Sequence, residues 1–303
     1  MDPRIPRRAF LARCSAALAL RMREDFAERL GIVCQFEPEE EATRKVLAAA
    51  RQAGFRRAQV HFPWDRATGG FLRGLRGWLA AEDVRADVVS AYVNCAVPEN
   101  VLMGARAGDL ERAIELAASL GASRLVAWTG GYGSGLMTAD ERNNQPAATD
   151  AICRFIEPRL KQLEANQLIL ALETYITLVC PDAPALRRLL DRLPPFIKAV
   201  LEPPNLTPLE RYSQRDEALR EMVQVLAGRI GVVHPKDFRL AAGGRKYDLP
   251  GPLAGEMNYP LYFDQIRTLP DDIPWIAEHL PPGEFTDAHA RIVTCLRANP
   301  GAQ

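Results

Sequence analysis

Eight short apolar runs alternate with amphipathic stretches along this 303-residue chain, which predicts an α/β protein with parallel strands and flanking helices. The runs are rich in Leu, Ile, Val and Ala, as expected of strands that are buried on both faces. Eight strand–helix units in about 270 residues match the usual size of a (β/α)8 barrel. We therefore predict a single (β/α)8 barrel over residues 31–298, with an N-terminal helical extension over residues 1–30.

The expected strands are identified by their composition and by the turn residues that bound them. They are residues 31–36, 58–62, 86–92, 123–128, 168–173, 197–202, 228–234 and 273–278. An open doubly wound sheet is the main alternative, and such a sheet usually has a glycine-rich turn after its first strand. The chain has Phe36-Glu37-Pro38-Glu39 at that point, which favours the barrel.

Three of the intervening helices have clear end signals. The stretch 39–54 begins with acidic residues and ends on a glycine, as the helix dipole and the usual C-cap favour. The stretch 109–121 opens on an aspartate and also ends on a glycine, and the stretch 183–193 is followed by two prolines. Two longer segments, 129–146 and 235–260, follow the fourth and seventh strands, where barrel enzymes place substrate loops.

Composition excludes several classes of partner. With 38 basic and 38 acidic side chains, the formal net charge is +0, so no general field attracts a nucleic-acid backbone or an anionic membrane. No apolar stretch reaches the ~20 residues needed to cross a bilayer. We therefore expect neither nucleic acid nor a membrane as a partner, while homo-oligomer formation stays open. The six cysteines form no CxxC pair, which argues against a thiolate zinc site and favours buried free thiols.

The first 30 residues allow two interpretations. Arg7 and Arg8 precede an apolar run, which is the pattern of a twin-arginine export signal. The run is interrupted by Arg13 and has no clear small-residue cleavage site, which favours an amphipathic helix or a decayed signal. We therefore expect a cytoplasmic protein, with periplasmic location by twin-arginine export as the alternative.

Four polar residues stand at the ends of the last four apolar runs, namely Glu173, Glu202, His234 and Glu278. Parallel strands bring their carboxyl ends to one edge of a barrel, where ligands and chemistry collect. Three carboxylates and one imidazole suit Mn²⁺ or Mg²⁺, with Co²⁺ or Zn²⁺ as further candidates. Such an ion can hold and polarise the carbonyl of a sugar, while Glu173 and Glu278 remove and return a proton.

Each of these residues alone has an ordinary structural explanation. A glutamate at a strand end is often a helix N-cap or a salt-bridge partner, and His234 could be a hydrogen-bonded core histidine. Their order on four consecutive strands favours the metal site. Nearby, Lys236 and Asp237 either orient substrate hydroxyls or pair with each other, and His61 and Trp64 either line the substrate site or pack in the core.

Several segments resemble the sugar-phosphate isomerase and epimerase families of the xylose-isomerase-like TIM-barrel superfamily, over roughly residues 31–295. The matching segments are AGFRRAQVHFPW (53–64), WTGG (128–131), ALET (171–174), LEPPNLT (201–207), HPKDFR (234–239), LPGPLAGEMNYP (249–260) and IPWIAEHL (273–280). The resemblance implies metal ligands at Glu173, Glu202, His234 and Glu278, with Glu173 and Glu278 as the catalytic acid/base pair. We assign substrate binding to residues at or near these segments, namely His61, Trp128, Asn205, Lys236, Asp237 and Arg239.

One position departs from the pattern of those families. The acid of the sixth strand is usually aspartate, in a pattern like D-P-x-N-L, whereas this chain has Glu202. The extra methylene could push the ion outward, make the coordination bidentate or weaken the site.

These observations predict a metal-dependent isomerase or epimerase of a sugar, ketose or inosose. A dehydratase of the same substrate class and a sugar-binding barrel without catalysis are the alternatives. An endonuclease-IV-like repair enzyme is disfavoured, because its metal cluster needs many histidines and this chain has only four.

Overall fold

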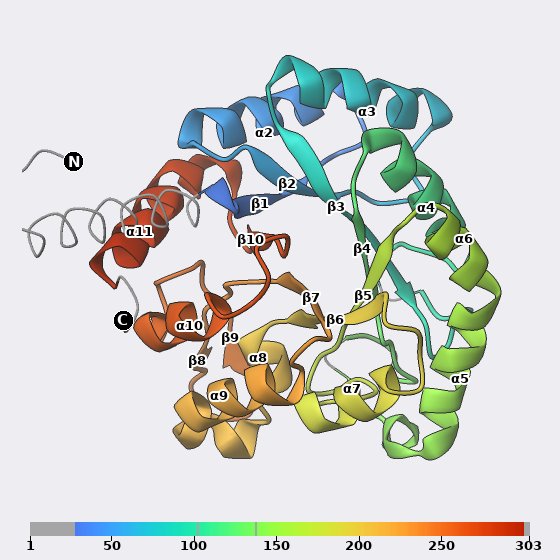
Figure 1. The fold of residues 1–303 in the computed structure, drawn as a ribbon, viewed down its shortest axis with the longest axis vertical. Coiled ribbons are helices and arrows are strands. Elements are labelled where there is room, and N and C mark those ends of the chain that lie inside the picture. The colour runs from blue at the N-terminus through green and yellow to red at the C-terminus, as the bar shows by residue number, and fades with distance from the viewer. Residues whose placement is uncertain (1–27, 102, 137, 300–303) are drawn as a thin grey trace, which may run out of the picture.

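The computed structural model describes residues 28–101, 103–136 and 138–299. Eight parallel strands close into a barrel in the order β1-β10-β7-β6-β5-β4-β3-β2, and helices surround it (Figure 1). The predicted (β/α)8 barrel is therefore confirmed. The predicted N-terminal extension lies almost wholly outside the described residues.

The barrel strands lie within a few residues of the predicted ones. They are β1 (Leu30–Gln35), β2 (Arg57–His61), β3 (Arg85–Asn94), β4 (Arg124–Trp128), β5 (Ile169–Glu173), β6 (Ile197–Leu201), β7 (Ile230–Val233) and β10 (Trp275–Ala277). Two short strands, β8 (Arg239–Leu240) and β9 (Tyr247–Asp248), form an antiparallel hairpin in the long segment after β7.

The α-helices follow the strands, and several loops carry additional short helices. The α-helices are α2 (Glu40–Ala53), α3 (Gly69–Ala81), α4 (Asp109–Leu120), α5 (Pro146–Ile156), α6 (Leu160–Ala165), α7 (Ala183–Leu190), α8 (Pro203–Leu206), α9 (Arg215–Val225), α10 (Tyr259–Ile266) and α11 (Phe285–Ala298). The 3₁₀ helices are η1 (Glu141–Asn144), η2 (Glu157–Arg159), η3 (Leu209–Gln214) and η4 (Pro282–Glu284). All three helices with clear end signals are confirmed, although α7 ends three residues before the predicted end.

Side-chain alternation divides the core into two layers. On β3, Val89 and Val93 pack outward among the helices, whereas Val88 and Tyr92 belong to the apolar cluster inside the barrel. The strand is irregular near its end, where its register with β4 shifts between Ser90 and Asn94 and Tyr92 has φ 43°. Such bulges re-aim side chains at the rims of barrels, and here the bulge accompanies an inward-pointing tyrosine.

The segment after β4 is tied down by asparagine side chains. The Asn94 amide nitrogen donates to the Gly131 carbonyl at 2.9 Å, and its oxygen accepts from the Gly131 N–H at 3.1 Å. Gly130 has φ 82°, and a Cβ there would lie 1.9 Å from Asn94 Oδ1. Asn143 holds the next turn by accepting from the Tyr132 N–H at 2.9 Å. The described part of this segment therefore has a defined path over the carboxyl edge.

Two further sequence expectations concern cysteines and membranes. The five cysteines in the described part of the chain are all free thiols, as expected. Among the described helices, none combines the length and the apolar character that crossing a bilayer requires.

Candidate active site

The four residues singled out at the strand ends meet at the carboxyl edge of the barrel. Glu173 is the last residue of β5, and Glu202, His234 and Glu278 directly follow β6, β7 and β10. All four are buried, with exposed fractions between 0% and 6%. Their placement agrees with the prediction that consecutive parallel strands carry them to one point.

One oxygen of each glutamate faces the same nitrogen of the histidine. His234 Nδ1 lies 3.1 Å from Glu202 Oε2 and 3.8 Å from Oε2 of both Glu173 and Glu278. Ligand atoms of Glu173, Glu202 and His234 lie within 4.8 Å of one another, which is close enough to share one ion. Glu278 does not belong to this group, so the structure brings three of the four predicted ligands within reach of one ion. We call the three glutamate oxygens that face the histidine, together with its Nδ1, the cation cup.

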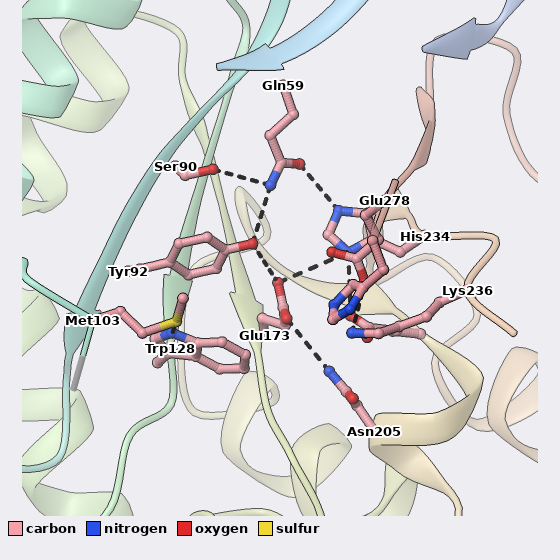
Figure 2. A network of polar contacts seen from close by, with 12 residues as sticks. Gln59, Ser90, Tyr92, Met103, Trp128, Glu173, Asn205, His234, Lys236 and Glu278 are labelled. Atoms are coloured by element: carbon pink, nitrogen blue, oxygen red, sulfur yellow. Dashed lines mark hydrogen bonds and ion pairs between the residues drawn. The ribbon is translucent and has the colours of Figure 1, made fainter. Parts of the chain in front are cut away.

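The other oxygens of the glutamates face anchoring groups. Lys236 Nζ lies 2.5 Å from Glu202 Oε1 and 2.8 Å from Glu278 Oε1, and Asn205 Nδ2 donates to Glu173 Oε1 at 3.3 Å. Figure 2 shows this arrangement, with Lys236 beside the carboxylates and Asn205 below Glu173. Each carboxylate therefore has one oxygen against an anchoring side chain and the other oxygen in the cation cup. Because Lys236 holds Oε1 of Glu202, that glutamate presents only one oxygen to an ion unless the contact breaks.

A second set of contacts joins the histidine to strands β2 and β3. Gln59 Oε1 lies 3.0 Å from His234 Nε2, and Gln59 Nε2 lies 3.0 Å from Ser90 Oγ and 3.2 Å from the Tyr92 hydroxyl. The Tyr92 hydroxyl donates to Glu173 Oε2 at 3.2 Å (Figure 2). The network therefore runs from one predicted ligand to another through residues that were not predicted.

A cavity of about 300 Å³ opens above the cup. It is lined by Val33, Gln35, His61, Tyr92, Met103, Trp128, Leu136, Glu173, Tyr175, Asn205, Lys236, Leu249, Glu278 and His279. Of the four predicted metal ligands, Glu173 and Glu278 line the cavity, whereas Glu202 and His234 do not. Two members of the set are therefore placed to touch a bound small molecule, and the other two lie beneath them.

The cavity holds several buried polar atoms without a hydrogen-bond partner. They are His61 Nδ1, Tyr175 OH, Asn205 Oδ1 and Glu278 Oε1. Glu278 Oε1 nevertheless forms an ion pair with Lys236 Nζ at 2.8 Å, so only the other three atoms are without a partner. Buried polar atoms are usually hydrogen-bonded, so three unpartnered atoms around one cavity indicate a site for a polar ligand.

The surroundings push the pKa values of the two cavity glutamates in opposite directions. Burial, reinforced by the charges of Glu202 and Glu278, raises the pKa of Glu173 well above its usual range. Burial also acts to raise the pKa of Glu278, but Lys236, His234 and His279 outweigh it and lower that pKa. Burial lowers the pKa of His61 to about 4, despite an opposing effect of Glu278. His61 is therefore neutral near pH 7.

The charges and donors of the cup fit a divalent cation. Three buried carboxyl groups surround a single buried ammonium, so their negative charge exceeds the positive charge beside them. Because uncompensated charge is costly in a buried site, a bound cation would be favoured there. The donors are three carboxylate oxygens and one imidazole nitrogen, a set typical of Mn²⁺ or Mg²⁺ sites.

The predicted substrate-binding residues divide into two groups. His61, Trp128, Asn205 and Lys236 line the cavity. Asp237 and Arg239 do not line it. Trp64 packs in the core, where its indole N–H donates to the Ser90 carbonyl at 2.9 Å.

Asp237 and Arg239 have other partners. The Asp237 carboxylate accepts from the N–H groups of Phe238, Gly255 and Met257 at 2.8–2.9 Å, so it shapes the long loop and does not pair with Lys236. Arg239 lies on the exposed hairpin, 3.8 Å from Asp248. Their assignment as substrate contacts therefore gains no support from this arrangement.

Several residues of the site were not identified from sequence, and the polar ones that contact the predicted residues or line the cavity include Gln59, Tyr92, Tyr175 and His279. The sequence does contain an indication for Gln59, because an amide in the middle of a buried strand needs hydrogen-bond partners. Tyr92 and Tyr175 stand at or just after the ends of β3 and β5, where aromatic residues pack in the core as often as they bind ligands. His279 follows Glu278 with φ 58°, a backbone conformation that periodicity does not reveal.

Comparison with known proteins identifies relatives of this barrel. Residues 47–295 match the sequence profile of a family described as xylose isomerase-like TIM barrel. No curated protein matches the chain significantly.

Solved structures of low sequence identity share the fold. A xylose isomerase domain protein from Planctomyces limnophilus is 16% identical, with a TM-score of 0.65 over 89% of this chain and 95% of that one. A xylose isomerase-like TIM barrel protein from Mycobacterium smegmatis, solved in complex with magnesium, is 17% identical, with a TM-score of 0.64 over 86% and 90%. A D-psicose 3-epimerase, solved in the presence of D-fructose, is 10% identical, with a TM-score of 0.65 over 90% and 99%.

Proposed function

Because the chain belongs to the xylose isomerase-like TIM barrel family, we propose that it is a divalent-metal-dependent isomerase or epimerase of a sugar, ketose or inosose. The D-psicose 3-epimerase among its structural neighbours is consistent with this class of substrate. The main support for this proposal is that Glu173 and Glu278 both line the cavity, whereas Glu202 and His234 do not.

Glu173 and Glu278 are the proposed acid/base pair. Glu173 ends β5 and Glu278 directly follows β10, and β6 and β7 separate these strands in the barrel, so the two side chains approach a bound molecule from different directions. One of them, as a carboxylate, removes a proton from the carbon beside a carbonyl. The other, as an acid, delivers a proton to the opposite face or to the neighbouring carbon. Glu278 Oε1 is paired with the Lys236 ammonium at 2.8 Å, which favours the carboxylate form of Glu278 and so its role as the base.

The remaining lining residues would orient the substrate. His61 Nδ1, Tyr175 OH and Asn205 Oδ1 are the unpartnered groups available to hydroxyls. Trp128 stacks on Tyr92 with ring centroids 5.1 Å apart, which gives the cavity one apolar wall for the C–H groups of a ring or chain. A few convergent polar groups beside an apolar wall are typical of a small-molecule site.

Glu173, Glu202 and His234 would hold the ion, with Glu278 as the predicted fourth ligand and Mn²⁺ or Mg²⁺ favoured. When bound, the ion would polarise the substrate carbonyl and so acidify the adjacent C–H.

The experiment is a substrate screen with hydrogen exchange. EDTA-treated protein is incubated with Mn²⁺ and a panel of ketoses, aldoses and inososes in H₂O and in D₂O. We expect one class to be converted without change of mass in H₂O, with deuterium incorporated in D₂O, and no conversion when EDTA stays in excess. Binding of a sugar without conversion by the Mn²⁺-loaded protein would contradict the proposal and favour a non-catalytic sugar-binding barrel.

A dehydratase of the same substrate class is the second candidate. Expulsion of a hydroxyl needs a proton donor, and Glu173, whose pKa burial raises well above its usual range, lines the cavity. The same screen separates the two reactions, because dehydration gives a product lighter by one water.

A further inference from the structure

We infer that Gln59 is a positioning residue that fixes the tautomer of His234 and so presents its Nδ1 lone pair to the cation cup. The inference rests on the proposed metal site and assigns a task to a residue of β2 that contacts neither the cavity nor the ion. Gln59 is fully buried, inside the barrel, and its amide contacts Ser90, Tyr92 and His234 (Figure 2).

The first step concerns the single proton of the Tyr92 hydroxyl. This hydroxyl lies 3.2 Å from both Glu173 Oε2 and Gln59 Nε2. The hydroxyl donates its one proton to Glu173 Oε2. The same hydroxyl oxygen must then accept from Gln59, which requires the nitrogen of the Gln59 amide on that side.

The second step follows from the orientation of the amide. Gln59 Nε2 has two protons, and they reach Tyr92 at 3.2 Å and Ser90 Oγ at 3.0 Å. Gln59 Oε1 therefore faces His234 Nε2 at 3.0 Å. A carbonyl oxygen only accepts, so His234 must carry a proton on Nε2. A neutral imidazole has one such proton, which leaves Nδ1 with a lone pair.

The third step concerns what this lone pair faces. Nδ1 points at three carboxylate oxygens, one at 3.1 Å and two at 3.8 Å. A lone pair does not bond to a carboxylate, whereas a cation between them binds both. Hydrogen-bond partners on the far nitrogen of a ligating histidine set its tautomer and ring orientation in the same way in metal sites generally.

The test compares three variants of the full chain. Gln59→Leu removes the acceptor, Gln59→Glu keeps an oxygen at the acceptor position, and Ser90→Ala removes a partner of Gln59 without touching the acceptor. Mn²⁺ affinity of EDTA-treated protein is measured by calorimetry. We expect Gln59→Leu to bind Mn²⁺ about 10–100-fold more weakly, as for other outer partners of metal ligands. We expect the other two variants to stay within about fivefold of the wild type, well short of that loss.

The tautomer itself provides a second readout that needs neither metal nor activity. The chain has four histidines, so ¹⁵N-histidine spectra of metal-free protein at pH 8 are simple enough to assign, with His234→Ala identifying the signals of His234. We expect Nε2 to carry a proton in the wild type and in Gln59→Glu, and to be only partly protonated in Gln59→Leu.

The outcomes separate this inference from the proposed function. Failure of the wild type to bind Mn²⁺ would overturn the metal site, and an unprotonated Nε2 in its spectrum would overturn the inference independently. Unchanged Mn²⁺ affinity in Gln59→Leu would overturn the inference while leaving the proposed function intact. Weakened affinity with an unchanged tautomer would also contradict it, because Gln59 would then act only through packing.

Discussion

Lys236 Nζ lies 2.5 Å from Glu202 Oε1, and both side chains are almost completely buried. This ion pair holds one oxygen of Glu202 away from the cation cup and directs the other toward His234 Nδ1. The ammonium also lies 2.8 Å from Glu278 Oε1, so one cation positions two of the proposed ligands. Lys236 is therefore part of the framework of the site as well as part of the cavity wall.

Loss of this ammonium should destabilise the metal-free protein. Removing one partner of a buried ion pair leaves uncompensated charge, so we expect Lys236→Met to lower the free energy of unfolding by about 3–5 kcal/mol. Urea denaturation in EDTA measures this. The exposed Lys45–Glu41 pair on α2 supplies the control, because Lys45→Met should cost less than about 1 kcal/mol. Equal stabilities of the two variants would refute the structural role of Lys236.

The pKa of His61 predicts a stability difference at acid pH. Because the pKa is lowered to about 4 in the folded protein from an ordinary value of 6.5, the unfolded chain takes up the proton first as the pH falls. The contribution of neutral His61 is thus complete above pH 6.5 and is lost between pH 6.5 and 4. Relative to His61→Gln, the metal-free wild type should lose up to about 3 kcal/mol across this window. A pH-independent difference between the two proteins would contradict the assigned pKa.

Gly130 should tolerate no side chain. Its φ of 82° costs about 1–2 kcal/mol for any L-residue, and a Cβ would collide with Asn94 Oδ1. We expect Gly130→Ala to lower the free energy of unfolding by more than that amount. The matched control is Gly77→Ala on α3, where a Cβ meets nothing within 4 Å and should stabilise the protein by about 0.5–1 kcal/mol. A neutral Gly130→Ala would show that the segment after β4 follows another path.

Glu278→Gln tests the acid/base pair once a substrate is known. The change keeps the size of the side chain and one oxygen donor but removes the basic carboxylate. Turnover should therefore fall by about 10²–10⁴-fold. Mn²⁺ binding should weaken much less, because a neutral oxygen still faces the cup. Steady-state kinetics together with calorimetry measure both quantities, and a retained rate would exclude Glu278 as an essential acid or base.

The barrel and the ends of its strands could be predicted because parallel strands that are buried on both faces consist of nearly continuous apolar runs. Glu173, Glu202, His234 and Glu278 stood out because each polar residue ends such a run. The partners of Lys236 and Asp237 could not be predicted in this way. Adjacent residues of opposite charge suggest a pair, whereas the fold turns Lys236 toward Glu202 and Asp237 toward the N–H groups of Gly255 and Met257.

Gln59 shows a different limit of sequence reasoning. Its position inside an apolar run indicates that it must find hydrogen-bond partners, but not which ones. Ser90 and Tyr92 lie on the neighbouring strand β3, whereas His234, which follows β7, reaches Gln59 across the interior only because the barrel closes. The bulge that accompanies Tyr92 likewise depends on the register between β3 and β4.

The most direct measurement of the central claim is the amount of Mn²⁺ that EDTA-treated protein binds, determined by calorimetry for the wild type and three variants. We predict one ion per chain in the wild type and no stoichiometric binding in Glu173→Ala or His234→Ala, both of which should remain folded. His289→Ala is the matched control, because His289 packs against Phe55 between α11 and α2, away from the cup, and should keep its ion. Unchanged binding in both Glu173→Ala and His234→Ala would contradict the assignment of the site.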